Sequence, residues 1–323
     1  MTASQYTLLA DIGGTNTRVA IAQDGIVLPD SIRRYPNANY PALEPILIDY
    51  RAQSGIDHLA GACVAAAGPV RDGVATMTNL NWVFEAGALA RVLHADRVVV
   101  LNDLQAQGYA LGYLAPDMLR QVLPGTAARP GASQLVVGIG TGFNAAPVHE
   151  APGGRIVVPS ECGHMTLPVS SDEDIRMRNF VARAHGFASV EDILSGRGVA
   201  EVYAFVQSEA GDTTKALDTT AVMAAFKAGE PLAVHTAQLF VRMMGAVIGD
   251  LALVHLPFGG IHLIGGVARA FAPWLQTYGF AESFHAKGRF SDFLTAFPVK
   301  VIEDDYAALT GCAVHLQEKL RTR

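Results

Sequence analysis

Short apolar runs alternate with helix-like segments along the first third of the chain. Four runs have the length of buried strands: Thr7 to Ala10, Arg18 to Ala22, Ala62 to Ala67 and Val98 to Leu101. Helical spacing of apolar residues is found between them, around Pro41 to Gln53 and Ala86 to Leu93. Strands that alternate with helices are typical of proteins in which helices cover a sheet. The pattern therefore predicts an α/β fold.

A strand that runs into a glycine turn occurs twice. The first leads into Asp11-Ile12-Gly13-Gly14-Thr15-Asn16, and the second is Leu135-Val136-Val137 leading into Gly138-Ile139-Gly140-Thr141-Gly142. Such an internal repeat indicates two related halves. The segment from Pro124 to Ser133 is rich in Gly, Pro and small residues, and we expect it to connect the halves.

The second half is richer in helices. Asp172 to Asp174 follow two serines and predict a helix that runs to about His185 and stops at Gly186. Ser189 with Asp192 resembles a capping box, which starts another helix. Further helices are expected at Asp218 to Ala228, Leu232 to His255 and from Asp304 or Asp305 to about Lys319, and further strands at Ile261 to Ile264 and Pro298 to Ile302.

Composition narrows the class of protein. A chain of 323 residues allows two domains, and 50% apolar against 17% charged residues excludes a disordered chain. The net charge of -6 leaves no basic excess for nucleic acid or an anionic membrane. Three scattered cysteines exclude a disulfide framework and a paired-cysteine zinc site. With no signal sequence, and with Val241 to Gly266 too interrupted to cross a membrane, we expect a soluble, cytoplasmic protein.

The two glycine turns are candidate phosphate sites. Backbone N–H groups of such a turn can cradle phosphate, and Asp11 could hold Mg²⁺ through water. A plain hairpin turn would explain either motif alone, but their recurrence favours phosphate binding. The sequence contains no P-loop, no protein-kinase signature and no dinucleotide fingerprint.

Polar residues in three further places could carry chemistry. Asp103 follows the strand that ends at Leu101, where α/β sheets bind ligands, and could accept a hydroxyl proton. It could equally be the N-cap of a helix that begins near Leu104. Glu161 and His164 could hold sugar hydroxyls, or they could be part of a solvated loop, and His164 could also be a satisfied core histidine. Glu191 could do the same, or could only favour the start of a helix.

A set of motifs runs over nearly the whole chain: Leu9 to Asn16, Met77-Thr78-Asn79 with Trp82, Leu101-Asn102-Asp103, Gly140-Thr141-Gly142, Glu161-Cys162-Gly163-His164, Leu194 to Gly198, Gly265-Gly266 and Lys287-Gly288-Arg289-Phe290. In combination these motifs resemble the bacterial glucokinase family of the hexokinase and actin-like ATPase superfamily. The resemblance implies two actin-like ATPase (ribonuclease H-like) α/β domains that flank an active-site cleft and close over ATP and sugar. The expected domains are a small one, residues 1–110 plus 303–323, and a large one, residues 111–302.

The resemblance also implies an activity and its residues. The expected reaction is ATP-dependent phosphorylation of D-glucose at the 6-hydroxyl, with Asp103 as general base, ATP and Mg²⁺ as cofactors, and a homodimer as the assembly. The implied sugar-binding residues are Asn102, Asp103, Glu161, His164 and Glu191. The implied ATP-binding residues are Ala10, Asp11, Ile12, Gly13, Gly14, Thr15, Asn16, Gly140, Thr141, Gly142, Gly265 and Gly266, with Asp11 also positioning Mg²⁺ through water. Gly311 resembles the second interdomain connection.

The chain departs from the family pattern in a few places. It has Phe143-Asn144 where the family commonly continues Leu-Gly, and Cys162 where glycine is commoner. Thr166 stands where an acidic residue is frequent, so we expect a modestly reshaped sugar pocket. Two alternatives remain: a kinase for another aldohexose or amino sugar, and a catalytically silent sugar-sensing protein. Asp103 argues against the second, because a pure binder needs no base there.

Overall fold

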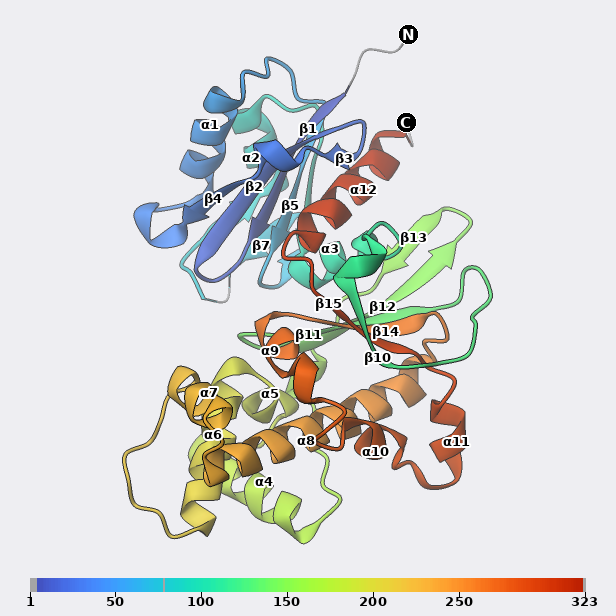
Figure 1. Cartoon of the computed structure of the whole chain (residues 1–323). Coiled ribbons are helices and arrows are strands. Elements are labelled where there is room, and N and C mark those ends of the chain that lie inside the picture. Colours follow the sequence, from blue (N-terminus) through green and yellow to red (C-terminus); the bar gives the residue numbers. More distant parts are fainter. Residues whose placement is uncertain (1–4, 78, 322–323) are drawn as a thin grey trace. The chain divides into compact units, whose positions relative to one another are not determined.

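The computed structural model describes residues 5–77 and 79–321 (Figure 1). Thr78, one of the residues that carry the family resemblance, lies outside the described residues. The chain folds into two compact units. The first consists of Met1–Pro116, Ala151–Pro159 and Asp304–Arg323, and the second of Asp117–Glu150 and Ser160–Glu303. The predicted domain boundaries, 1–110 with 303–323 and 111–302, stay a prediction.

The first unit is built on a sheet with the strand order β3-β2-β1-β5-β9, with β4 paired to β2. Its strands are β1 (Tyr6–Ile12), β2 (Asn16–Gln23), β3 (Ile26–Val27), β4 (Arg33–Pro36), β5 (Gly61–Ala66) and β9 (Val98–Asn102). Strand β1 is antiparallel to β2 and parallel to β5, which is parallel to β9. The four strands predicted in this region are therefore confirmed.

Helices and a small second sheet complete the first unit. The helices are α1 (Leu43–Ser54), α2 (Ala86–Leu93), α3 (Asp103–Ala110) and α12 (Ala307–Arg321). The small sheet contains β6 (Val70–Arg71), β7 (Val74–Thr76) and β8 (Val83–Glu85), and β13 (Gly154–Val157) packs near α3. Helix α12 begins at Ala307 rather than at the predicted Asp304 or Asp305, because the Asp304 carboxylate accepts a hydrogen bond from the Tyr306 N–H at 2.7 Å in the preceding turn.

The second unit repeats the strand pattern of the first. Its strands run in the order β10-β15-β14-β11-β12 and comprise β10 (Leu119–Leu123), β11 (Gln134–Ile139), β12 (Phe143–Ala151), β14 (Gly260–Ile264) and β15 (Val299–Ile302). Strand β11 is antiparallel to β12 and parallel to β14, which is parallel to β15. The antiparallel and parallel pairings match those around β1, so the two related halves are confirmed.

Most helices of the second unit lie in one long stretch of the chain. They are α4 (Asp172–His185), α5 (Val190–Ile193), α6 (Gly196–Glu209), α7 (Thr219–Lys227), α8 (Pro231–His255), α9 (Gly266–Phe271), α10 (Phe280–His285) and α11 (Ser291–Leu294). The stop at Gly186 and the capping box of Ser189 and Asp192 are confirmed. The segment from Pro124 to Ser133 joins β10 to β11 inside this unit, so its predicted role as the connection between halves is wrong.

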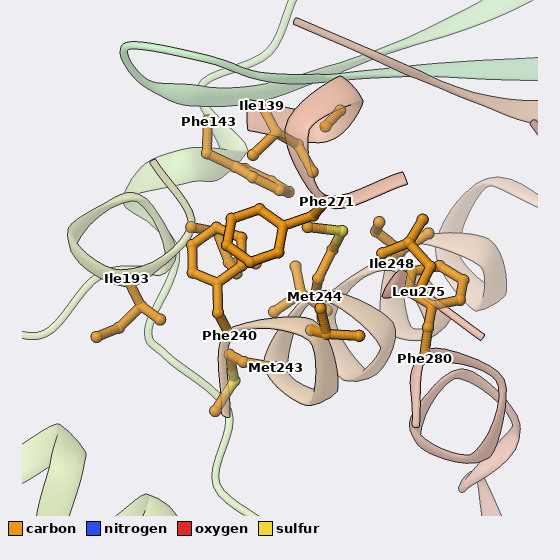
Figure 2. Close-up of a cluster of buried hydrophobic side chains, with 14 of the residues drawn as sticks. Ile139, Phe143, Ile193, Phe240, Met243, Met244, Ile248, Phe271, Leu275 and Phe280 are labelled. Carbon is orange, nitrogen blue, oxygen red and sulfur yellow. The ribbon is translucent and has the colours of Figure 1, made fainter. Parts of the chain in front are cut away.

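Helix α8 forms the centre of the second unit's core. Figure 2 shows its side chains Phe240, Met244 and Ile248 in a cluster with Phe271. The rings of Phe240 and Phe271 stack with their centroids 4.6 Å apart. By length and composition α8 could span a membrane, but 67% of its most apolar window is buried inside the molecule, as in the core helix of a soluble protein. The apolarity of α8 is therefore explained by packing.

Helix α12 packs closely on α3 through Gly311. A side chain at this position would place its Cβ 1.7 Å from the carbonyl oxygen of Ala106. We predict that Gly311→Ala lowers the free energy of unfolding by about 2 kcal/mol, because overpacking outweighs the gain in helix propensity. Urea unfolding followed by circular dichroism measures the change. Gly153→Ala, where the added Cβ meets nothing within 4 Å, is the control, and equal stability of the two variants would contradict the close packing.

His315 of α12 is buried against Tyr109, with ring centroids 4.0 Å apart. Burial, with a smaller effect of Lys319, lowers the pKa of His315 from 6.5 to about 4. As the pH falls below 6.5, the unfolded chain binds a proton that the folded chain does not, so stability is lost on acidification. We predict that between pH 7.5 and pH 5 the wild type loses about 2 kcal/mol more than His315→Gln does. Equal losses in the urea-unfolding free energies of both proteins between the two pH values would refute this.

Candidate functional site

The glycine turn of the first unit lies between β1 and β2 and is held by a buried asparagine. The Gly13 N–H donates to the Asn16 carbonyl oxygen at 3.0 Å and closes the turn. Asn37 is only 3% exposed, and its Nδ2 and backbone N–H donate to the carbonyl oxygens of Gly13 at 2.8 Å and Thr15 at 2.9 Å. Thr17 Oγ1 in turn donates to Asn37 Oδ1 at 2.8 Å. Asn37 therefore fixes the shape of the turn, a role that no sequence motif indicates.

Asp11 lies at the end of β1, directly before this turn. Its carboxylate forms an ion pair with the Arg18 guanidinium of the neighbouring strand at 3.0 Å, and its side chain is 12% exposed. Burial raises the pKa of Asp11, and Arg18 offsets only part of that effect. Ala10 and Ile12 are fully buried in the sheet's core, so neither offers its side chain to a ligand.

Asn102 and Asp103 lie at the junction of β9 and α3. Asn102 is the N-cap: its Oδ1 accepts from the Leu104 N–H at 2.9 Å, and its own N–H donates to Gln105 Oε1 at 3.1 Å in a capping box. Its Nδ2 also donates to the Gly68 carbonyl oxygen at 3.1 Å. The interpretation of Asp103 as the N-cap is therefore wrong. Asp103 is the first helical residue, is partly exposed, and accepts from the Leu104 N–H at 2.8 Å.

In the second unit, Glu191 lies directly against the glycine turn. Its Oε2 accepts from the Phe143 N–H at 2.9 Å, and its Oε1 accepts from Arg197 Nη2 at 3.1 Å. A Cβ at Gly142 would lie 2.5 Å from Glu191 Oε2, so the carboxylate reaches this position only because Gly142 has no side chain. Glu191 is therefore more than a first-turn acid of α5, because it connects that helix to the turn between β11 and β12.

The two predicted nucleotide segments of the second unit are neighbours. Gly265 has a φ of 101°, and a Cβ there would lie 2.3 Å from the Ile139 carbonyl oxygen at the end of β11. Gly266, the first residue of α9, follows directly. The N-terminus of α6 joins them, since the Gly196 N–H donates to the Gly140 carbonyl oxygen at 2.7 Å. The segment Leu194 to Gly198, to which the sequence assigned no role, is thus part of the same arrangement.

Glu161 and His164 are exposed neighbours in one tight loop. The His164 N–H donates to the Glu161 carbonyl oxygen at 3.1 Å, at a short 3-10 helix, Cys162–His164. The Val190 N–H donates to the Met165 carbonyl oxygen at 3.0 Å, which holds the end of the loop beside α5. Burial raises the pKa of the half-buried Cys162, so its thiol is protonated at neutral pH.

The candidate residues form one set in each unit. Those of the first unit are Ala10 to Asn16, Asn102 and Asp103, and those of the second are Gly140 to Gly142, Glu161, His164, Glu191, Gly265 and Gly266. Within residues 5–77 and 79–321, no group of three or more His, Cys, Asp or Glu side chains could hold a metal ion by itself. Each set can place polar side chains and backbone N–H groups around polar ligands.

A duplicated sheet in which β1 and β11 both run into glycine turns is the arrangement of the actin-like ATPase fold, which sugar kinases share. Solved structures agree with this class. The crystal structure of glucokinase from an Antarctic psychrotroph superposes with a TM-score of 0.86 at 29% identity, covering 97% of this chain and 98% of that one. The ROK hexokinase from Thermus thermophilus superposes with a TM-score of 0.65 at 21% identity, covering 98% and 100%, and shows the shared fold.

The chain belongs to the glucokinase family. A family model described as Glucokinase matches residues 8–319. The chain is 36% identical over 320 residues to the glucokinase of Cupriavidus metallidurans, covering 97% of this chain and 94% of that protein. It is 31% identical over 315 residues to the glucokinase of Marinobacter nauticus, covering 97% and 98%. As a member of this family, the chain is an enzyme that phosphorylates glucose with ATP and Mg²⁺.

Proposed function

We propose that this enzyme transfers the γ-phosphoryl group of ATP to the 6-hydroxyl of D-glucose, with Asp103 as the general base. The assignment rests on the different positions of Asn102 and Asp103 at the start of α3. Asn102 caps the helix with its side chain, so Asp103 is not needed as the N-cap. The Asp103 carboxylate lies at the carboxyl end of β9, where α/β sheets bind ligands, and can accept the hydroxyl proton as the new P–O bond forms.

We assign sugar binding to Asn102, Asp103, Glu161, His164 and Glu191. Carboxylates and imidazoles accept or donate the hydrogen bonds that sugar hydroxyls need. Glu161 and His164 are exposed and adjacent, and their loop is held beside the helix that carries Glu191. Both oxygens of Glu191 already accept hydrogen bonds from the chain, so its carboxylate is fixed before a sugar arrives. A fixed acceptor loses little side-chain freedom on binding.

We assign ATP binding to the glycine turns of both units. Backbone N–H groups of Gly13 to Thr15 and Gly140 to Gly142 suit phosphate oxygens, while Gly265 and Gly266 suit the nucleoside. Phosphoryl transfer has a loose transition state, so catalysis depends mainly on alignment and charge compensation. Water must also be kept from the γ-phosphate, because its hydroxyl competes with that of glucose.

Asp11 fits a Mg²⁺ ion that arrives with ATP. Its carboxylate lies next to the first glycine turn and is shared with Arg18, so it offers one oxygen ligand or a water-mediated contact rather than a complete site. Mg²⁺ keeps several waters and takes one or two carboxylates together with substrate phosphates, which agrees with a lone aspartate. When bound, the ion would neutralise phosphate charge.

We further propose that the enzyme is a cytoplasmic homodimer.

The base assignment is tested by Asp103→Asn. We predict that kcat falls about 10²- to 10⁴-fold, the usual contribution of a general base, while glucose still binds. ADP release with Mg²⁺-ATP measures turnover across glucose, fructose, mannose, glucosamine and N-acetylglucosamine, and calorimetry measures glucose binding. The exposed Asp30→Asn serves as the control and should remain fully active. An Asp103→Asn enzyme that retains most of its activity would rule out the mechanism.

A second test compares two neighbouring glycines. The methyl group of Gly142→Ala would displace the Glu191 carboxylate, whereas that of Gly140→Ala enters space with no heavy atom within 4 Å among the neighbours considered. We predict that Gly142→Ala mainly raises the KM for glucose, about tenfold, because a charge-assisted hydrogen bond is lost. Gly140→Ala should mainly raise the KM for ATP. Steady-state kinetics with both substrates varied measure the two KM values. If both variants raised the KM for glucose and the KM for ATP in the same ratio, the separate roles assigned to Gly140 and Gly142 would be wrong.

A further inference from the structure

Asn144 is the second residue of β12. Its side chain contacts the loop that carries Glu161, and no sequence motif indicates these contacts. Its Nδ2 donates to the Ser160 carbonyl oxygen and, at 3.2 Å, to Glu161 Oε2. Its Oδ1 accepts from the Cys162 N–H at 3.2 Å and lies 2.9 Å from Ser160 Oγ and 3.5 Å from Cys162 Sγ. One amide therefore contacts three consecutive residues of the loop, here called the Glu161 loop (Ser160–Cys162).

The orientation of this amide is set by its neighbours. Its nitrogen faces only acceptors, the Ser160 carbonyl and the Glu161 carboxylate, while its oxygen faces backbone N–H groups of Ala145 and Cys162. A flipped amide would place oxygen against oxygen and N–H against N–H. Both N–H donors of Asn144 are thus used in the Glu161 loop, one on the backbone and one on the carboxylate.

Glu161 itself is exposed, so its side chain would otherwise sample several rotamers. Fixing a glutamate side chain costs conformational entropy, and in a preorganised site this cost does not fall on ligand binding. The hydrogen bond from Asn144 occupies only Oε2 of Glu161 and leaves the carboxylate other positions at which to accept hydroxyls.

We propose that Asn144 is a positioning residue for sugar binding. It holds the Glu161 loop and orients the Glu161 carboxylate, so it sets the affinity for glucose even though it directly follows the glycine turn assigned to phosphate. The inference rests on the proposed role of Glu161 in sugar binding. Asn144 and Cys162, which both depart from the family pattern, are in contact with each other. The positioning role would therefore explain Asn144 and connect it with Cys162.

A role in phosphate binding is the alternative that the position suggests. The turn closes before Asn144, since the Gly140 N–H donates to the Gly142 carbonyl oxygen at 2.9 Å and the Phe143 N–H is taken by Glu191. Asn144 lies opposite Gly138 inside the β11–β12 pairing. The two roles predict different kinetics, because loss of a phosphate contact raises the KM for ATP, and loss of loop positioning raises the KM for glucose.

The experiment compares Asn144→Ala with the nearly isosteric Asn144→Asp. We expect Asn144→Ala to raise the KM for glucose and the calorimetric Kd for glucose about tenfold, with the KM for ATP changed less than twofold. Asn144→Asp should be worse for glucose than Asn144→Ala, because it places a second carboxylate beside that of Glu161. Raised KM for ATP with an unchanged KM for glucose in both variants would overturn the proposal.

Two further variants make the test specific. His149→Ala, at an exposed position farther along β12, controls for general perturbation of the strand and should leave both KM values within twofold of the wild type. The double variant of Asn144→Ala with Glu161→Ala tests the route of the effect. If Asn144 acts through Glu161, the double variant raises the KM for glucose by less than the product of the single effects. Fully multiplicative effects would contradict the proposal.

The outcomes separate this inference from the proposed function. An unchanged KM for glucose in Glu161→Ala would overturn the role of Glu161 in sugar binding, and the role of Asn144 with it. A raised KM in Glu161→Ala together with unchanged kinetics in Asn144→Ala would overturn the positioning role of Asn144 alone. Thermal unfolding of each variant verifies that the protein remains folded.

Discussion

The hydrogen bond from the Phe143 N–H to Glu191 Oε2 joins the two parts of the second unit's site. On one side of it, the Phe143 side chain is 2% exposed and points into the same core cluster as Phe240 and Phe271 (Figure 2). On the other side, the carboxylate reaches the turn only across Gly142, and Arg197 holds its second oxygen. The glycine turn and helix α5 are therefore joined by a hydrogen bond between a strand anchored in the core and a carboxylate that Arg197 holds.

The hydrophobic pattern predicts those elements whose signals are local. Helices α2 and α4 have the predicted bounds, because their apolar spacing and end residues agree. The sequence pattern does not predict helix α6, because this helix begins with Gly196 and contains Gly198, and glycine is a poor helix former. Its start is fixed instead by Ser195, whose Oγ accepts from the Gly198 N–H at 3.1 Å. A Cβ at Gly198 would lie 2.0 Å from the Ile193 carbonyl oxygen, so the close approach of α5 and α6 requires glycine there despite its low helix propensity.

The same distinction applies to the candidate site. Glycine turns at strand ends are visible in the sequence because the glycines cluster directly after an apolar run, and Asp103 is visible because it follows the end of a strand. The asparagines that hold these segments are not visible, because Asn37 lies 24 residues from Gly13, and Asn144 lies 17 residues from Glu161. Neither asparagine belongs to a periodic pattern. The sequence left open whether Asp103 is a base or the N-cap of α3, and it did not indicate that Asn102 is the cap.

Phe143 and Asn144 both depart from the family pattern, and strand geometry gives their side chains different roles. Successive side chains of a β-strand point to opposite faces, so the two residues cannot serve the same neighbour. Phe143 fills the core, and Asn144 contacts the Glu161 loop, while the turn at Gly140 to Gly142 keeps the family's residues. A larger core residue and a loop-binding amide thus replace leucine and glycine without placing a side chain in the turn itself. Neither side chain enters the turn whose backbone is proposed to bind phosphate.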